Sequence, residues 1–540
     1  MTTSSLRTVR RLRPRLDADQ SRVITRLFVP GQEGFDHQDS RVSAVLARVL
    51  ALDECEVGVA LRDVQARFEH RHRELDEIFE CHAADVADRL PAGAALSDER
   101  RLLIGATFTS EFAIEGTALC NPSIVPHPDQ GGVAPGALRI VMSVRAIGEG
   151  HRSSIGFRSG TIGRTGTVRI DRPSSYATTG HVEPALLQSA ALRTEMYKLD
   201  PSAENTDFVL NALGEQFSII DLEVQLARLE SHAATRKHRA HTAQLFRELA
   251  ERTYRTRFHP GTALSERVLW PSMSAERHGI EDARFVRFED RDALTYYATY
   301  TAYDGEEIRQ QLLETSDFTE FTSSPLVGGA AANKGLALFP RKIGGRFAAL
   351  SRWDRETNAI AFSDNPHVWQ EAVAFQAPAR SWEILQLGNC GSPIETDDGW
   401  LVLTHGVGPM RTYGIGAVLL DLDDPTRVVG QMDEPLLTPD ASERDGYVPN
   451  VVYSCGALVH AGNLVIPYGI SDVAIGAATV ALADVLAAVG RHPRPRPTTR
   501  STAMPEKSPQ KPAGKKVGKS LKEKRADKRD KKDGRAIIPR

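Results

Sequence analysis

The chain has 540 residues, of which 41% are hydrophobic and 25% are charged, as expected for a soluble globular protein with a substantial core. Its five cysteines are scattered and lack CxxC spacing, which argues against a disulfide scaffold or a zinc ribbon and favours a reducing compartment. No stretch approaches about 18 uncharged apolar residues, and the N-terminus lacks the apolar segment of a secretory signal. We therefore expect a cytoplasmic protein with no membrane partner.

The net charge of −3 hides a strong asymmetry along the chain. Residues 491–540 contain 18 Lys and Arg against 5 Asp and Glu, a net charge of +13, which leaves −16 for the remainder. We predict that residues 490–540 form a disordered basic tail, because their Pro, Lys, Arg and Ser cannot bury enough apolar surface. Such a tail could bind a polyanion weakly and non-specifically, or could serve only as a solubilising extension.

Two stretches have the apolar spacing of helices. Residues 1–40 are expected to be flexible or partly ordered, and 41–110 to form a helical region. A second helical block is predicted at about 185–260, with a leucine-rich stripe. The stripe is typical of packing or of a contact between copies of the chain, so a homo-oligomer could form through these helices. The residues that carry the two patterns are Val64, Phe68, Leu75, Phe79 and Val86, and then Phe208, Leu210, Leu213, Phe217, Ile220, Leu222, Leu226 and Leu229.

The rest of the chain repeats one pattern five times: an apolar strand, a polar or aromatic break, and a small-residue strand that ends in a turn. Five similar β units indicate a propeller, in which each blade buries its faces against its neighbours. Unrelated strands in a sandwich would explain the number of strands but not their recurring order. We predict a mainly β fold, with a five-bladed β-propeller at 111–485 and the helical insertion between blades 1 and 2. The repeats occupy 138–162, 294–318, 345–369, 399–425 and 462–486.

Polar segments stand at corresponding places in these units, where a propeller would direct them toward its central channel. They are CNPSIVPHPD (120–129), GIEDARF (279–285), NKGLALFPRKIGGRFAALSRWD (333–354), GNCGSPIETDDGWLVLTHGV (388–407) and YVPNVVYSCGALV (447–459). In this order they resemble the blade openings of glycoside hydrolase family 130, the β-mannoside phosphorylases and hydrolases. The EDAR run is similar to the family's Glu-Asp-Pro-Arg signature, with Ala283 in place of the proline.

The resemblance implies inverting cleavage of a β-mannosidic bond in an oligosaccharide, with Asp282 as the acid that protonates the leaving oxygen. This role requires a carboxyl group that is protonated near neutral pH, hence desolvated or beside another carboxylate. From its sequence alone, Asp282 could instead be a residue that caps a turn at the end of a strand. The other positions expected to bind the sugar are Asn121, Arg145, Glu281, Arg284, Asp304 and Asp472.

Phosphorolysis and hydrolysis make different demands on the site. Phosphate as nucleophile needs clustered cations and hydrogen-bond donors. The family usually has arginine where this chain has Lys334 and lysine where it has Gln386, so one charge is lost. We therefore favour a glycosidase, with a phosphorylase that releases mannose 1-phosphate as the alternative. The positions that match the family's phosphate site are Arg145, Lys334, Arg352, Gln386, His405 and Tyr413.

A hydrolase needs a carboxylate base across the sugar from the acid, and Glu115, Asp304 and Asp472 are eligible for it. No metal or cofactor is expected, and inorganic phosphate would be a co-substrate of a phosphorylase. A hypothesis of another class is a non-catalytic propeller that binds glycans or polyanions.

Overall fold

The computed structural model describes residues 9–13, 15–30, 40–200, 202–231, 237–290 and 293–490, all within a single unit, Met1–His492. Antiparallel sheet makes up most of the regular structure after residue 108, so the fold is mainly β, as predicted. The predicted basic tail lies outside the described residues except for Gly490, and so do residues 1–8, 14 and 31–39 of the predicted flexible start. Within the described part of the chain, no helix has the length and apolar character needed to cross a membrane.

The N-terminal part combines short strands with helices. Strand β3 pairs with β4, and the helices α1 to α4 come between them in sequence. Helix α2 begins at a capping box, in which Asp53 accepts from the backbone N–H of Glu56 and the Glu56 side chain accepts from the backbone N–H of Asp53. The bounds are β1 Arg10–Arg11, β2 Leu16–Asp17, β3 Val23–Leu27, α1 Ser40–Ala51, α2 Glu54–Phe68, α3 Leu75–Asp85, α4 Asp98–Thr107 and β4 Thr109–Ala113.

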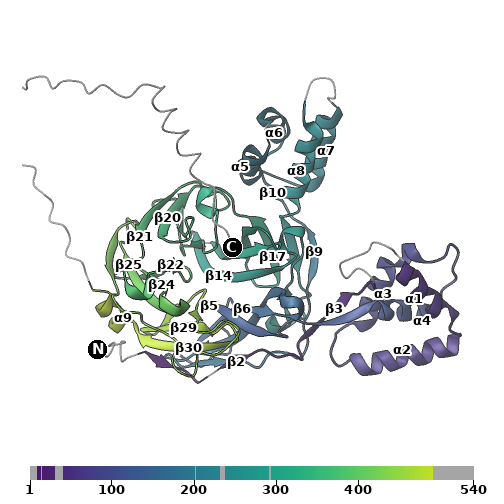
Figure 1. Ribbon diagram of the computed structural model, residues 1–540, viewed down its shortest axis with the longest axis horizontal. Coiled ribbons are helices and arrows are strands. Elements are labelled where there is room, and N and C mark those ends of the chain that lie inside the picture. Colours follow the sequence, from purple (N-terminus) through teal and green to yellow (C-terminus); the bar gives the residue numbers. More distant parts are fainter. Residues whose placement is uncertain are drawn as a thin grey trace, which may run out of the picture. The chain divides into compact units, whose positions relative to one another are not determined.

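The first large sheet contains two antiparallel groups of strands, β5–β8 and β14–β17, joined where Gly279 of β14 pairs in parallel with Ser153 of β7. Figure 1 labels β5 and β6 of the first group and β14 and β17 of the second. Strands β12 and β9 extend the second group at its outer edge. The bounds are β5 Ala118–Pro126, β6 Leu138–Ile147, β7 Ser153–Ile162, β8 Val168–Ile170, β9 His181–Pro184, β12 Tyr254–Arg257, β13 Val268–Leu269, β14 Gly279–Asp290, β15 Ala293–Tyr303, β16 Ile308–Thr315 and β17 Glu320–Pro325.

Three further antiparallel sheets follow in chain order: β18–β21, β22–β26, and β27–β30, the last of which β1 and β2 complete. The bounds are β18 Ala337–Leu338, β19 Phe347–Ser351, β20 Asn358–Ser363, β21 Ala372–Gln376, β22 Gln386–Asn389, β23 Ile394–Thr396, β24 Gly399–Val407, β25 Tyr413–Leu420, β26 Val428–Gln431, β27 Val452–Tyr453, β28 Leu458–His460, β29 Asn463–Ile470 and β30 Ala474–Ala481, followed by helix α9 Leu482–Val489.

Strand β24 shows how these sheets pack, because successive side chains point to opposite faces. Trp400 and Val402 pack in a cluster with Leu350 of β19, whereas Leu401 and Leu403 pack in another with Ile466 of β29. The strand is buried along its whole length, which explains its continuous apolar run in the sequence.

The other groups of strands also contribute buried apolar side chains to clusters that they share with neighbouring groups. Strands β5 and β7 pack with β14 and β15, while β14 and β16 pack with β19 and β20. Strand β6 packs with β29 and β30, so the first group of strands also lies against the last sheet. Each group of strands therefore buries apolar residues against the group before it and the group after it.

The insertion between the first two groups is helical and has its own core. Leu222, Leu226 and Leu229 are fully buried in it, as their spacing indicated, but Ile220 of the same stripe is 72% exposed. The bounds are β10 Leu187–Gln188, α5 Ser189–Leu199, α6 Ala203–Leu210, β11 Gln216–Phe217, α7 Ile219–Ser231 and α8 Arg239–Ala250.

A buried ionic cluster connects the N-terminal segment to the first sheet. Glu115 accepts from Arg22 at 2.9 Å and from Arg158 of β7 at 2.6 Å, and all three side chains are almost fully buried. One carboxylate is thus shared by two guanidinium groups, and the remaining N–H groups of Arg22 donate to the carbonyl oxygens of Ser174 and Ser265.

We expect Glu115→Gln to lower the free energy of unfolding by about 3–5 kcal/mol, because it removes the carboxylate charge that two buried arginines share. Urea denaturation of the variant and the parent protein would measure this loss. Glu289→Gln, an exposed carboxylate on β14, serves as the control and should change stability by less than about 1 kcal/mol. Equal stability of the Glu115 variant and the parent would show that this ionic cluster does not stabilise the fold.

Candidate active site

A cavity of about 160 Å³ is lined by side chains from segments far apart in the sequence. It brings together nine of the positions predicted from the sequence. They are Asn121, Asp282, Arg284, Lys334, Arg352, Gln386, His405, Tyr413 and Asp472.

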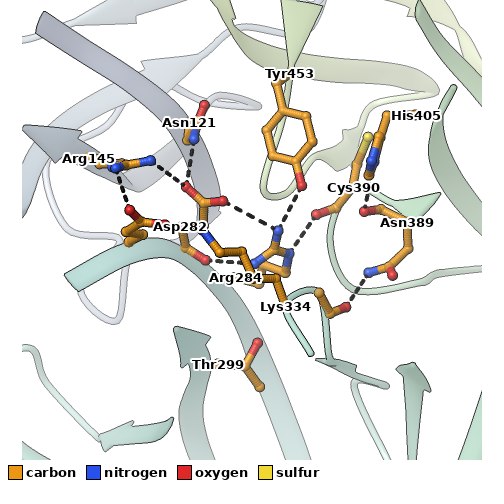
Figure 2. A network of polar contacts seen from close by, with 12 residues as sticks. Asn121, Arg145, Asp282, Arg284, Thr299, Lys334, Asn389, Cys390, His405 and Tyr453 are labelled. Carbon is orange, nitrogen blue, oxygen red and sulfur yellow. Dashed lines mark hydrogen bonds and ion pairs between the residues drawn. The ribbon is translucent and has the colours of Figure 1, made fainter. Parts of the chain in front are cut away.

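The position of Asp282 depends on a bulge in β14. Pairing with β15 is regular up to Glu281 and resumes at Arg284, which leaves Asp282 and Ala283 without partners. Asp282 has a φ of 59°, a left-handed conformation that costs a non-glycine residue about 1–2 kcal/mol. Strand β5 has a similar shift after Cys120, where Asn121 has a φ of 48°. The two bulges turn both side chains toward each other, and Asn121 Nδ2 donates to Asp282 Oδ1 at 2.6 Å (Figure 2).

Because of the bulge, Glu281 and Asp282 do not point to opposite faces of the strand, as adjacent strand residues would. Arg145 of β6 contacts both: Nη2 donates to Glu281 Oε1 at 2.7 Å, and Nη1 lies 3.6 Å from Asp282 Oδ1. Lys334 forms an ion pair with the second oxygen of Glu281. Two neighbouring carboxylates thus share one cluster of cations.

Arg284 is buried and its hydrogen bonds are directed by the backbone around it. Its Nε donates to the carbonyl oxygen of Cys390 at 3.0 Å, and Nη1 donates to that of Asp282 at 2.9 Å. Its Nη2 donates to the hydroxyl of Tyr453 at 2.8 Å and lies 3.8 Å from Asp282 Oδ2. The guanidinium therefore holds a fixed positive charge beside the Asp282 carboxylate.

These charges determine the ionisation of the two acids that line the cavity. Burial alone would raise the pKa of Asp282, but the positive charges of Arg145, Arg284 and Lys334 outweigh it and hold this pKa below its usual value. At Asp472, burial raises the pKa to about 6, and the charge of Asp282 adds to the rise. The resemblance implied a protonated Asp282, but the cations around this carboxyl group favour its ionised form.

His405 orients Arg352 rather than adding a charge to the site. Burial and the neighbouring Arg352 hold the pKa of His405 well below its usual value, so the ring is neutral. Its Nδ1–H then donates to the carbonyl oxygen of Asn389 at 3.2 Å, and its Nε2 accepts from Arg352 Nη1 at 3.1 Å. Gly388 allows this approach, because a Cβ there would lie 2.5 Å from the imidazole and 2.6 Å from the guanidinium.

Two buried polar atoms of the lining have no partner among the described residues: Asn121 Oδ1, an acceptor, and Arg352 Nε, a donor. Buried polar groups in proteins are almost always hydrogen-bonded. Both atoms are therefore available to a hydroxylated or anionic ligand.

Four sequence-predicted residues lie elsewhere. Arg145 and Glu281 do not line the cavity but contact the residues that do. Asp304 lies in the turn between β15 and β16, where it accepts from Arg309 and from the backbone N–H groups of Glu306 and Glu307. Glu115 is held by its two arginines. The structure therefore does not bring Asp304 or Glu115 to the site.

Four lining residues were not predicted from the sequence: the polar Arg411 and Tyr453, and the apolar Val448 and Val451. Arg411 follows β24 in the turn η7 (Pro409–Arg411) and precedes Tyr413 by two residues, so its place between two predicted site residues could have indicated it. Tyr453 was within a motif that had been noted, but an aromatic residue there is equally typical of core packing.

The part of the chain that forms this cavity is similar to known proteins. Residues 242–491 match the family model described as beta-1,4-mannooligosaccharide phosphorylase, a span that includes every lining residue except Asn121. A 1,2-beta-oligomannan phosphorylase of Thermoanaerobacter sp. (strain X514) is 33% identical over 232 residues, which is 41% of this chain and 75% of that protein.

A beta-1,2-mannobiose phosphorylase of Listeria innocua is 29% identical over 243 residues, or 42% of this chain and 65% of that one. The solved structure of a Listeria innocua beta-1,2-mannobiose phosphorylase with beta-1,2-mannobiose superposes with a TM-score of 0.41 at 20% identity, over 70% of this chain and 93% of that chain. The resemblance found in the sequence is confirmed: this chain belongs to glycoside hydrolase family 130, the β-mannoside phosphorylases and glycosidases.

Proposed function

We propose that this enzyme cleaves a β-mannoside by inverting phosphorolysis and releases mannose 1-phosphate. The cluster of cations and donors beside Asp282 carries this proposal. Sequence analysis favoured hydrolysis because Gln386 lacks the charge of the family's lysine. Arg411 lines the same cavity and can supply that charge, and the relatives named above are phosphorylases.

We further propose that the five groups of strands are the blades of a β-propeller at 111–485, with the helical insertion between blades 1 and 2. Each group packs apolar residues against the next, and the last against the first, as a closed ring of blades requires. The lining residues come from all five groups. The domain bounds given from the sequence, with a helical region at 41–110, are part of this proposal.

In the proposed reaction, a phosphate oxygen attacks the anomeric carbon of the mannose from the face opposite the leaving group. The bond between that carbon and the glycosidic oxygen breaks, and the leaving oxygen takes a proton that originates from the Asp282 carboxyl, through a hydroxyl of the bound sugar. The configuration at the anomeric carbon inverts once. Asp282 must be protonated for this step, although the protein's own charges favour its anion.

Bound phosphate would change the ionisation of Asp282. A bound phosphate would add negative charge among the cations that depress the pKa of Asp282. A neighbouring anion raises the pKa of a carboxyl group, so phosphate would favour the protonated, catalytic form of Asp282. The acid would then be ready only when the nucleophile is present, which protects the site against unproductive proton transfer.

The phosphate would bind Arg352, Arg411, Lys334 and Tyr413. His405 directs one N–H of Arg352, and the buried Nε of Arg352 is free to donate to a phosphate oxygen. The sugar would bind Asn121, Arg284 and Asp472, which line the same cavity. The linkage is β-1,2 or β-1,4, the linkages that the names of the relatives specify.

Hydrolysis is the second candidate, and one observation favours it. Of the three carboxylates eligible as a base, Asp472 alone lines the cavity, and its pKa of about 6 is suited to accepting a proton from water. A water molecule activated by Asp472 would take the place of phosphate.

The two reactions are distinguished by assaying the cleavage of β-1,2- and β-1,4-mannobiose with and without inorganic phosphate. A phosphate concentration of about 10 mM lies above the usual range of KM values. We expect cleavage only with phosphate, with α-mannose 1-phosphate detected by NMR. Free mannose formed at the same rate without phosphate would contradict phosphorolysis.

In either reaction Asp282→Asn should reduce kcat at least about 100-fold, because an amide cannot donate the proton. Asp290→Asn, on the same strand and paired with Lys342 at the surface, is the matched control and should retain activity.

If Arg411 replaces the missing lysine, Arg411→Met should raise the KM for phosphate at least about tenfold, the cost of losing one charge-assisted contact. The KM for the mannoside should change much less. Adding Gln386→Lys to this variant should restore most of the phosphate affinity. An unchanged KM for phosphate in Arg411→Met would show that the Arg411 charge does not contribute to phosphate binding.

Asp472 also makes stability depend on pH. Its folded-state pKa of about 6 lies above the usual aspartate value, so the folded protein binds this proton more tightly than the unfolded chain does. Its contribution is complete below about pH 4 and is lost as pH rises through about 6. Asp472→Asn should therefore gain stability relative to the parent between pH 4 and 7, by at most about 3 kcal/mol. Thermal unfolding of both proteins across this pH range would measure the gain. A difference in stability that does not change with pH would contradict the raised pKa of Asp472.

A further inference from the structure

A second and larger cavity, of about 990 Å³, lies where the helical insertion meets the sheet of β14–β17. Helices α5 and α8 form one wall, and β16 with the turn η5 (Gly329–Ala331) forms another. Figure 1 shows α5 and α8 together in the insertion, with β17 of this sheet next to it. The size is within the range of pockets that hold a small-molecule ligand.

Arg252, which follows α8, gives this cavity its chemistry. Its side chain is 7% exposed and lines the cavity, yet no hydrogen bond or ion pair joins its guanidinium to any residue that the structure describes. Its Nε is buried without a partner. Burial lowers its pKa to about 10, which leaves the group positively charged at neutral pH. The carboxylates of Glu195 and Glu276 favour its charged form through space, but neither forms an ion pair with it. A buried charge without an ion pair costs several kcal/mol, so a ligand anion that pairs directly with Arg252 would be stabilised here.

The other cations beside the cavity are engaged. Arg309 forms ion pairs with Asp304 and Glu307, and Arg277 donates to the carbonyl oxygen of Asp304. Among the described residues that line this cavity, Arg252 is thus the buried cation without an ion pair, whereas Lys198 is exposed to solvent.

Gln310 adds a second requirement. Its Nε2 donates to the carbonyl oxygen of Asn333 at 2.7 Å, which fixes the amide, and its Oε1 is buried without a donor. A ligand that pairs with both of these side chains therefore presents an anionic group to Arg252 and a hydroxyl donor to the side-chain oxygen of Gln310.

We propose that this cavity is a second ligand site, separate from that of Asp282, and that it takes a sugar phosphate. The phosphate group pairs with Arg252 and a sugar hydroxyl donates to Gln310. The site is next to the reaction centre along the chain, because η5 lines this cavity and Lys334, three residues after it, lines the other. The proposal does not depend on whether the enzyme uses phosphate or water.

The test is isothermal titration calorimetry with mannose 6-phosphate, which has no phosphate on its anomeric carbon and so cannot act as a mannosyl donor. The parent protein, Arg252→Met and Arg352→Met are compared, the last removing a cation of the Asp282 cavity. We expect Arg352→Met to bind as the parent does and Arg252→Met to bind at least about tenfold more weakly. The proposal is overturned by equal affinity of Arg252→Met and the parent, by loss of binding in Arg352→Met, or by no binding to the parent at about 10 mM ligand.

Two further measurements exclude a merely structural role for Arg252. Thermal unfolding of Arg252→Met should show a Tm equal to or above that of the parent, since a buried unpaired charge has been removed. Arg252→Lys keeps the charge without the planar fork and should bind with intermediate affinity. Equal loss of binding in the Lys and Met variants, or binding of inorganic phosphate alone as tight as that of mannose 6-phosphate, would overturn the assignment of a sugar phosphate.

Discussion

The balance of charge at the bulge of β14 is the constraint on which the site depends. The bulge directs two consecutive carboxylates, Glu281 and Asp282, to one cluster of cations, where a regular strand would have separated them. Lys334 and Arg145 make their shortest contacts with Glu281, whereas the guanidinium groups nearest Asp282 lie 3.6 and 3.8 Å from its oxygens. The Asp282 carboxylate is therefore attracted to cations without being tightly paired to any of them. Its protonation state can therefore respond to whatever charge enters the cavity.

Much of the fold could be predicted from the sequence, because periodic apolar patterns are local. The repeated β units and the helical stripes around Leu222 and Leu226 depend on residue spacing alone, and both are found in the structure. The exposure of Ile220 could not be predicted, since a stripe shows that one face of a helix is apolar but not how wide the partner surface is. Only the packed neighbours determine that width.

The site was less predictable for a related reason. Ordered motifs indicated Asp282, Arg352 and His405, which the structure brings to one cavity from separate segments. Asp304 and Glu115 were eligible by residue type and by their position near strand ends, but their carboxylates are already paired with arginines. Pairing partners are distant in the sequence, as Arg22 is from Glu115, so a single sequence does not show which acids are neutralised. The ionisation of Asp282 depends on such distant charges as well.

The pairing of β1 and β2 with β30 also has a consequence for handling the protein. A terminal strand such as β30 would otherwise present a row of unpaired backbone N–H and C=O groups, which invites pairing with other molecules and aggregation. Residues near the start of the chain cover that edge of the final sheet, although the two are more than 450 positions apart. An affinity tag or a truncation close to Arg10 would thus act on the solubility of the opposite end of the folded domain.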